Sequence, residues 1–276
     1  MDISINGKPA DITLESEKTV GDILSGIEGW LEGSEHRIGG LRIDGETIDV
    51  GALAESFTLD IDHIKALDIK IISWPELAME ALLNAQEELK FYENASFEDQ
   101  CRIRSGWEYQ VAAGFLSEQI PDMGECIGKT LDGAGFTPEE TSHLIDERIR
   151  ELEDPSGELN AIGSLVTGIT GRLEDLPLDI QTGKDGRAAE TVQLFSHITE
   201  KLFRILHVLT FRGLALDAIS IDTVPMHSFI EEFSASLKEL VGAYEAKDVV
   251  LVGDLAEYEL APRLLKFYTA LSNPCY

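Results

Sequence analysis

The stretch IKALDIKIISWPE, residues 64–76, divides the sequence into a β-rich part and a helical part. In its first half, Leu67, Ile69 and Ile71 alternate with other residues, which is typical of a strand with one buried face. Its end, Ser73-Trp74-Pro75-Glu76, has the Ser-x-x-Glu spacing of a helix capping box, with proline in the first turn. The sequence therefore predicts an α+β fold with one domain over residues 1–72 and an α-helical bundle over residues 73–276.

The β-rich part contains short strand patterns around a single helix. DISI (2–5) and ADITLE (10–15) are expected to form a hairpin, because Asn6-Gly7 is a strong two-residue turn signal. Thr19 is expected to cap a helix that ends near Gly33, since apolar residues then recur at helical spacing: Val20, Ile23, Leu24, Ile27, Trp30 and Leu31. HRIGGLRIDGETI (36–48) places Asp44-Gly45 between two further β-rich runs. The predicted order is ββα followed by ββ.

This order resembles the ubiquitin-like β-grasp fold over about a quarter of the chain. The matching stretches are Met1–Ile5, Ile12–Glu15, Thr19 at the helix start, LRIDGETI (41–48) and ALAESFTLDI (52–61). The resemblance implies a compact recognition or docking module. Where modifiers of this fold end in a free diglycine, this chain continues as IISWPELAME (71–80), so conjugation and sulfur-carrier chemistry are not implied. Arg42 falls at the centre of the surface that is apolar in ubiquitin, which argues against a ubiquitin-type binding face.

Helical periodicity dominates from Ser73 onward. After the helix that begins there, further helices are expected at 97–131 (broken near Pro121), 138–153, 158–174, 186–219, 224–246 and 248–272. Asp154-Pro155-Ser156-Gly157 and the stretch from Pro177 to Gly186 are expected to separate helices. Each amphipathic helix buries one stripe, so the helices are expected to pack together as a bundle.

The charge of the chain narrows the classes of partner. It has 22 Lys and Arg against 51 Asp and Glu, a formal net charge of −29. Such a field repels nucleic acids and anionic membranes, so neither is expected as a partner. Three cysteines without paired spacing, no signal-peptide pattern and no apolar run of membrane-spanning length favour a cytoplasmic protein. The acidity is either functional or an adaptation of the source organism.

Local motifs offer little catalytic chemistry. Gly124-Glu125-Cys126-Ile127-Gly128-Lys129-Thr130 is one residue short of a phosphate-binding loop and lies in a helical context. Glu140 and His143 have the Glu-x-x-His spacing found in metal sites of helical bundles, but Glu140 is explained by a capping box that begins at Thr137. No catalytic residue, metal or cofactor is therefore predicted.

One long helix carries four chemically suggestive side chains on one face, namely His197, Glu200, Arg204 and His207. They could hold a metal or carry protons, with Glu200 as partner of the imidazoles. The favoured interpretation is instead that Glu200 and Arg204 form an ordinary ion pair four residues apart.

The favoured function is a non-catalytic acidic protein-interaction protein, such as an adaptor, assembly factor or chaperone-like partner. Its protein partner is expected to be basic, and Asp254, Glu257 and Tyr258 on the last helix are candidate contacts. The alternative is an enzyme or small-ligand-binding protein with a site between helices or at the domain junction. His143, His197 or His207 would then contribute polar groups.

Overall fold

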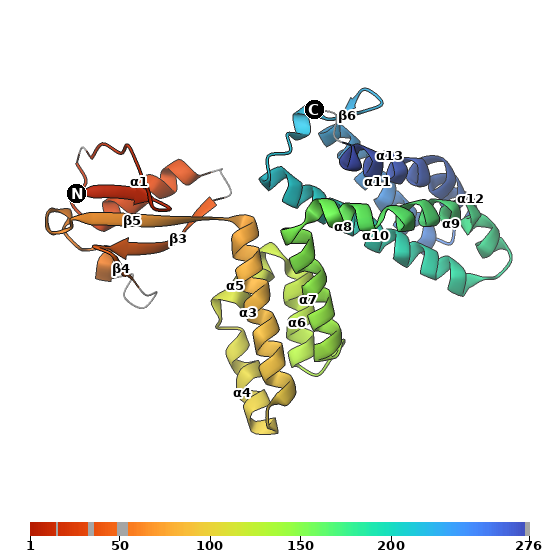
Figure 1. The fold of residues 1–276 in the computed structure, drawn as a ribbon. Helices are drawn as coiled ribbons and strands as arrows, with labels where there is room; N and C mark the ends of the chain where they lie inside the picture. Colours follow the sequence, from red (N-terminus) through yellow and green to blue (C-terminus); the bar gives the residue numbers. More distant parts are fainter. Residues whose placement is uncertain (15, 33–35, 49–54, 274–276) are drawn as a thin grey trace. The chain divides into compact units, whose positions relative to one another are not determined.

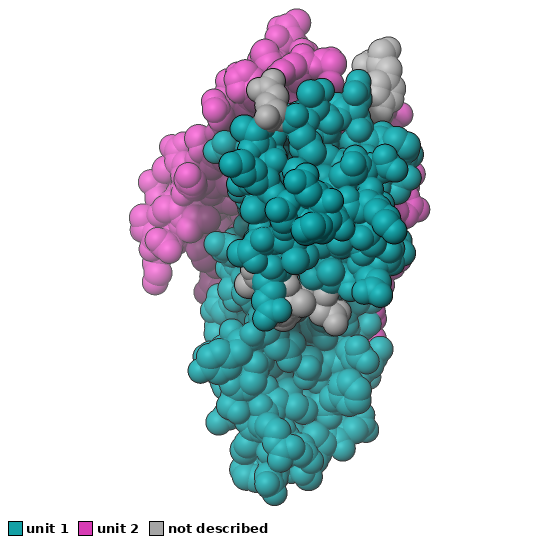
Figure 2. All heavy atoms as spheres, turned by 90° about the vertical axis from the view of Figure 1, so that its left-hand side faces the viewer, with its two compact units in different colours: residues 1–141 teal, residues 142–276 magenta. Residues whose placement is uncertain are grey.

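The computed structural model describes residues 1–276 except 15, 33–35, 49–54 and 274–276. The fold is α+β overall, with a mixed sheet and one long helix in residues 1–73 and a mainly helical region after them (Figure 1). The chain forms two compact units, residues 1–141 and 142–276, coloured separately in Figure 2. A domain boundary at residue 72 stays a prediction.

The sheet has five strands in the order β2-β1-β5-β3-β4. β1 and β5 are parallel neighbours, whereas the other pairs are antiparallel. The strands are β1 (Asp2–Ile5), β2 (Lys8–Pro9), β3 (His36–Ile43), β4 (Glu46–Thr47) and β5 (Ala66–Ser73).

Both predicted tight turns are confirmed. Asn6 and Gly7 have φ angles of 51° and 72°, and Asp44 and Gly45 have φ angles of 52° and 89°. Two consecutive positive φ angles are typical of type I′ hairpin turns. The predicted second strand over 10–15 is wrong for residues 10–14: β2 ends at Pro9, and Ala10 N–H donates to the Ile3 carbonyl at 2.9 Å, but residues 10–14 belong to no strand. Glu15 lies outside the described residues.

The helix α1 (Val20–Leu31) packs one face on the sheet, as predicted. Thr19 and Asp22 form its capping box, with the Thr19 hydroxyl oxygen accepting from the Asp22 N–H at 3.2 Å. The buried face is formed by Val20, Ile23, Leu24, Ile27 and Leu31, which pack with Ile3, Leu41, Leu67 and Ile69 of the strands. Trp30, predicted on the apolar face, is instead 69% exposed.

Four helices complete residues 1–131. They are α3 (Trp74–Asn94), α4 (Phe97–Trp107), α5 (Val111–Gln119) and α6 (Pro121–Leu131). The predicted capping box of Ser73 and Glu76 begins α3. The predicted helix over 97–131 breaks at Pro121 as expected and a second time around Gln110. The glycine-containing stretch 124–130 lies inside α6, so it is not a phosphate-binding loop.

The rest of the chain is mainly helical, and its described residues include one small hairpin. Its helices are α7 (Pro138–Glu153), α8 (Pro155–Ala161), α9 (Gly163–Gln181), α10 (Asp185–Phe211), η2 (Leu216–Ala218), α11 (Met226–Glu245), α12 (Val249–Asp254), η3 (Leu255–Leu260) and α13 (Ala261–Ser272). The strands β6 (Ser220–Ile221) and β7 (Val224–Pro225) pair as a hairpin. Phe195, Phe233 and Phe267 are among the fully buried side chains of this core.

Two predicted helix ends in this region are wrong, and the predicted helix over 158–174 is divided at Ile162 into α8 and α9. The helix α9 continues through Pro177 to Gln181 because tertiary packing holds the proline, and a Cβ at Gly253 of α12 would lie 2.8 Å from Pro177 Cγ. The helix α10 ends at Phe211 and not at residue 219. The β6–β7 hairpin that follows turns at Asp222 and Thr223, whose φ angles of 50° and 72° are rare for residues with a side chain.

The predicted last helix, 248–272, contains a π-helical segment, η3. Pro262 follows it and has no N–H to donate to the carbonyl four residues earlier. The turn before the proline is correspondingly wider, since Ala261 N–H donates to the carbonyl of Ala256, five residues back.

Candidate functional site

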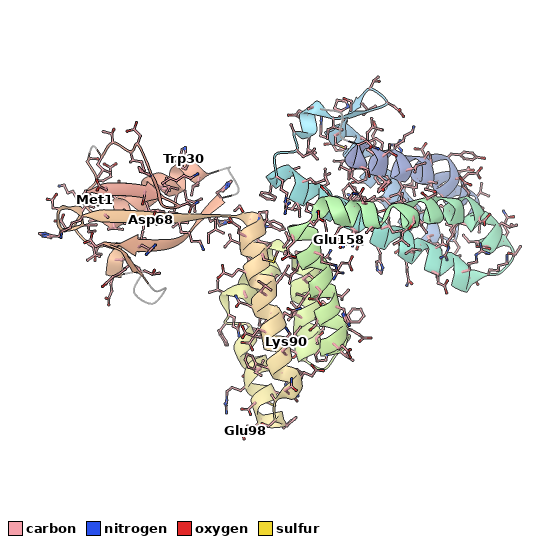
Figure 3. All side chains as sticks on the ribbon, in the orientation of Figure 1. Met1, Trp30, Asp68, Lys90, Glu98 and Glu158 are labelled. Carbon is pink, nitrogen blue, oxygen red and sulfur yellow. The ribbon has the colours of Figure 1, made fainter. Side chains whose placement is uncertain are left out.

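The strongest candidate for a binding surface is a groove between α1 and the segment that follows β2. Its volume is about 510 Å³, and mostly apolar side chains line it. The lining residues are Ile5, Ala10, Asp11, Ile12, Leu14, Glu17, Asp22, Ile23, Gly26, Ile27 and Trp30. Trp30, labelled in Figure 3, is 69% exposed, and Ile12 is 36% exposed. The groove therefore presents uncovered apolar surface to solvent.

The position of α1 fixes the wall of this groove. Val20 N–H donates to the Leu59 carbonyl and Gly21 N–H donates to the Phe57 carbonyl, each at 3.0 Å. A Cβ at Gly21 would lie 2.9 Å from the Phe57 carbonyl oxygen, so only glycine permits this approach. Gly26 lines the groove, and a Cβ built on it would meet nothing within 4 Å. The missing side chain of Gly26 thus leaves the groove open.

The charge of the groove is negative. Asp11, Glu17 and Asp22 are the ionisable residues among the described residues of its lining, none of which is basic. The Asp22 carboxylate accepts from the N–H groups of Lys18 and Thr19, each at 2.9 Å, and these hydrogen bonds hold the pKa of Asp22 below its usual value. The Asp22 carboxylate therefore stays ionised at neutral pH and favours a cationic neighbour.

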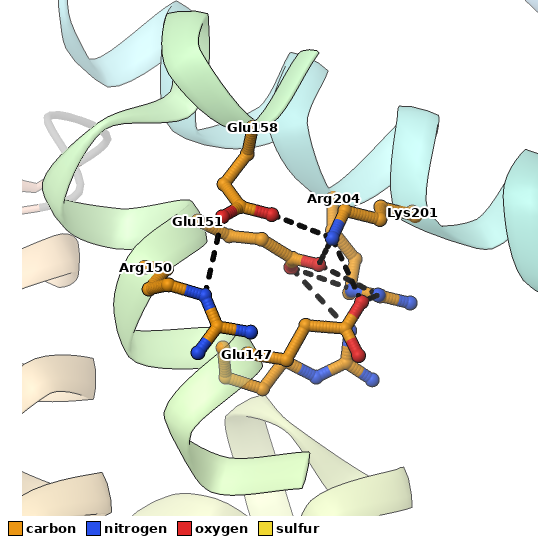
Figure 4. A network of polar contacts seen from close by, with 7 residues as sticks. Glu147, Arg150, Glu151, Glu158, Lys201 and Arg204 are labelled. Carbon is orange, nitrogen blue, oxygen red and sulfur yellow. Dashed lines mark hydrogen bonds and ion pairs between the residues drawn. The ribbon is translucent and has the colours of Figure 1, made fainter. Parts of the chain in front are cut away.

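A second candidate is a buried ionic network at α7, α8 and α10 (Figure 4). The Lys201 ammonium lies 2.9 Å from Glu147 Oε1, 2.7 Å from Glu158 Oε2 and 3.7 Å from Glu151 Oε1. Burial alone would lower the pKa of Lys201, but its hydrogen bonds to Glu158 and Glu147 raise it above the usual value. The ammonium is thus held in its charged form among three carboxylates.

Glu151 is the most buried member of this network, at 2% exposure. Its two carboxylate oxygens accept from Nε and one terminal nitrogen of Arg204, each at 2.8 Å. Burial raises the pKa of Glu151 to about 7, although Arg148 and Lys201 lower it. The predicted pair of Glu200 with Arg204 is therefore wrong. A bidentate bond to a buried carboxylate outweighs an exposed pair worth a fraction of a kcal/mol.

The network has the features of a structural clamp. Its carboxylates are each engaged by Lys201, Arg204, Arg150 or Arg148. Within the described ranges, no three His, Cys, Asp or Glu residues are grouped so that they could hold a metal ion. The side chains of His143, His197 and His207 are exposed and are not brought together as such a group.

The predicted contacts Asp254, Glu257 and Tyr258 lie at the end of α12 and in η3, and all three are exposed. Tyr258 is 66% exposed, and its hydroxyl hydrogen bond to Glu257 raises the pKa of the phenol. The segment is therefore an accessible acidic surface with one aromatic ring. A binding role for it stays a prediction.

Sequence reasoning did not identify the groove or the network. The only local signal for the groove was Trp30 at the edge of the helical stripe, with Gly26 one turn earlier. The network joins residues 147–158 to residues 201–204, which are more than 40 positions apart along the chain, so no local pattern could reveal it.

Comparisons with known proteins match both parts of the chain. Residues 1–73 match the family model described as the TP0873 N-terminal domain, and residues 159–270 match a domain of unknown function, DUF8042. The chain is also similar to an uncharacterized protein of Treponema pallidum (strain Nichols), with 22% identity over 264 residues that cover 95% of this chain and 92% of the relative. No solved structure matches the chain.

Among the described residues, none of the helices has both the length and the apolar character needed to cross a membrane.

Proposed function

We propose that this chain is a non-catalytic protein-interaction protein whose groove beside α1 binds a basic, amphipathic segment of a partner protein. The observation that carries the proposal is the exposed Trp30 beside an apolar groove of about 510 Å³. Exposed aromatic side chains next to apolar pockets are typical of residues that dominate protein interfaces.

The charge of the groove selects the chemistry of the partner. The part of the lining that the structure describes has three carboxylates and no cation, so a segment with lysine or arginine beside its apolar anchors fits best. The net charge of −29 adds a long-range attraction for such a segment. Electrostatic attraction of this kind acts mainly on the association rate and weakens as salt shortens the Debye length.

The proposal also includes the docking domain, the location and the role of the protein. We propose that residues 1–72 are a ubiquitin-like β-grasp domain that serves as the docking module, and that the protein acts in the cytoplasm as an adaptor, assembly factor or chaperone-like partner. Asp254, Glu257 and Tyr258 offer a second acidic surface for the same or another partner.

The test compares two labelled peptides with the full chain by fluorescence polarisation. One peptide is an amphipathic helix of leucine and lysine, and the other replaces each lysine with glutamate. We expect only the basic peptide to bind, with an affinity that falls as salt rises. A leucine-free peptide of lysine and serine, with the same charge, separates apolar anchoring from simple attraction and is expected to bind at least about tenfold more weakly.

Two glycines of α1 supply a matched pair of variants. A Cβ at either Gly26 or Gly29 would meet nothing within 4 Å, but only Gly26 lines the groove. Gly26→Met should therefore block the basic peptide, whereas Gly29→Met should bind it normally. Trp30→Ala should weaken binding by about tenfold or more.

Equal effects of the two methionine variants would contradict the groove as the binding site. Equal binding of the leucine-containing and leucine-free basic peptides would show that the acidic surface attracts cations without a docking site.

A further inference from the structure

We propose that a depression between α8, α10 and α13 binds a small carboxylic acid with a branched apolar body. The depression has a volume of about 280 Å³ and is separate from the groove of residues 1–73. Its polar lining comes from Ser156, Asn160, Arg212 and Ser272, and its apolar lining includes Leu159 and Leu271. All of these residues belong to the unit of residues 142–276.

Arg212 supplies the positive charge of the site. One of its terminal nitrogens donates to the carbonyls of Leu152 and Glu153 at 2.6 Å and 2.7 Å. These two bonds fix the guanidinium at the wall of the depression before any ligand arrives. A guanidinium has five N–H donors in a planar fork, which matches the two oxygens of a carboxylate. Arg212 is the only basic residue among the described residues that line the depression.

Ser272 supplies a hydroxyl group that is removed from solvent. Its Oγ is buried and has no hydrogen-bond partner within the described part of the chain. A buried polar atom without a partner is unusual in a native structure and calls for an explanation, such as strain, a functional role or an unseen water or ion. Ser272 lines the same depression as Arg212, so a rotation of its side chain to another rotamer lets one ligand engage both groups.

The apolar lining determines the chemistry and size of the ligand beyond its carboxylate. Leu159 and Leu271 are 3% exposed each, so the lining they form belongs to the packed core. The volume of about 280 Å³ lies just below the usual range for small-molecule pockets, about 300–1,000 Å³, so the ligand must be small. A short branched chain attached to a carboxylate therefore fits the depression, with its carboxylate at Arg212.

The test uses isocaproate and its uncharged counterpart isocaproamide as probes of the full-length protein, measured by isothermal titration calorimetry. These two molecules have the same apolar body and differ in the charge of the head group. We expect isocaproate to bind at least about tenfold more tightly than the amide, which is the fold-change typical of losing a charged hydrogen bond. Equal binding of the two probes, or binding of neither, would overturn the proposal.

Two variants connect the binding to the named side chains. Arg212→Gln should reduce the affinity for isocaproate to that for the amide. Since Arg212 also holds the end of α7, Ser272→Ala provides a second variant that leaves those bonds intact, and circular dichroism verifies the fold of both.

Ser272→Ala should weaken isocaproate binding several-fold while the melting temperature of the free protein stays the same or rises, because the substitution removes an unpartnered hydroxyl. Ser236→Ala, on a serine of α11 outside the depression, is the matched control and should leave the affinity unchanged. Unchanged affinity in Ser272→Ala, or equal losses in both serine variants, would overturn the assignment.

Discussion

Replacing Arg204 with methionine should destabilise residues 142–276 by about 3–5 kcal/mol at about pH 8, the range measured when one partner of a buried ion pair is removed. Glu151 is 2% exposed and accepts two hydrogen bonds of 2.8 Å from Arg204. Without them its carboxylate keeps only longer contacts, 3.5 Å to Arg148 and 3.7 Å to Lys201. Methionine replaces most of the aliphatic volume, so the loss reports the uncompensated charge and not a large cavity.

The double variant Arg204→Met with Glu151→Leu should recover most of this loss. An apolar pair of similar volume removes the charges of Arg204 and Glu151 together, and such replacements are often neutral or stabilising. Lys201 keeps its contacts of 2.9 Å to Glu147 and 2.7 Å to Glu158 in this variant. The double variant also removes the contacts of Glu151 to Arg148 and Lys201, so the coupling between Arg204 and Glu151 is obtained only when Glu151→Leu is measured as the other single variant.

Urea titration measures the loss of stability in Arg204→Met, and the positions of the tryptophans provide an internal control. Trp30, Trp74 and Trp107 all belong to residues 1–141, so their fluorescence reports that unit, while far-ultraviolet circular dichroism reports the helices of both units. With a denaturant slope of about 2 kcal/mol per molar urea, the loss corresponds to a midpoint shift of about 2 M in the dichroism signal. The fluorescence transition should not move.

A loss below about 1 kcal/mol in Arg204→Met would refute the reasoning, because it would equal that of an exposed pair. So would a double variant as unstable as the single one, or a fluorescence transition that shifts together with the dichroism.

Three further predictions concern stability. Glu151→Gln should flatten the dependence of the free energy of unfolding on pH, because the pKa of Glu151 is raised from 4.5 to about 7 in the folded chain. The stability contributed by the protonated carboxyl is complete below about pH 4.5 and is lost as pH rises through 7, and it amounts to about 3 kcal/mol. Urea titrations across this pH range measure it. Gly26→Ala should stabilise residues 1–141 by about 0.5–1 kcal/mol, seen as a later fluorescence transition, because it removes a helical glycine without a clash. Gly253→Ala should cost about 1–2 kcal/mol in thermal unfolding through the clash with Pro177, whereas Gly242→Ala, with nothing near its added Cβ, should not destabilise.

Local chemistry in the sequence predicted the features that depend on neighbouring residues. The turns at Asn6-Gly7 and Asp44-Gly45 are confirmed because positive φ angles favour these residues wherever they occur. The capping boxes that begin at Ser73 and Thr137 are also confirmed, since each is closed within four residues. Trp30 was placed wrongly because the periodicity of a helix does not show where the packed face ends.

The sequence alone determined three properties of this chain: its α+β fold class, the change from strands to helices at Ser73 and its acidic character. Periodicity and capping depend on neighbouring residues, and net charge is a sum over all residues. Tertiary structure decided which polar groups meet. Arg204 bonds to Glu151, 53 positions away, and not to Glu200 on the same helix. Pro177 stays inside a helix because Gly253 lies against it. Gly26 opens a groove only because α1 lies beside the segment after β2. In each case the deciding energy comes from burial against a partner that is distant in the chain, which no local pattern records.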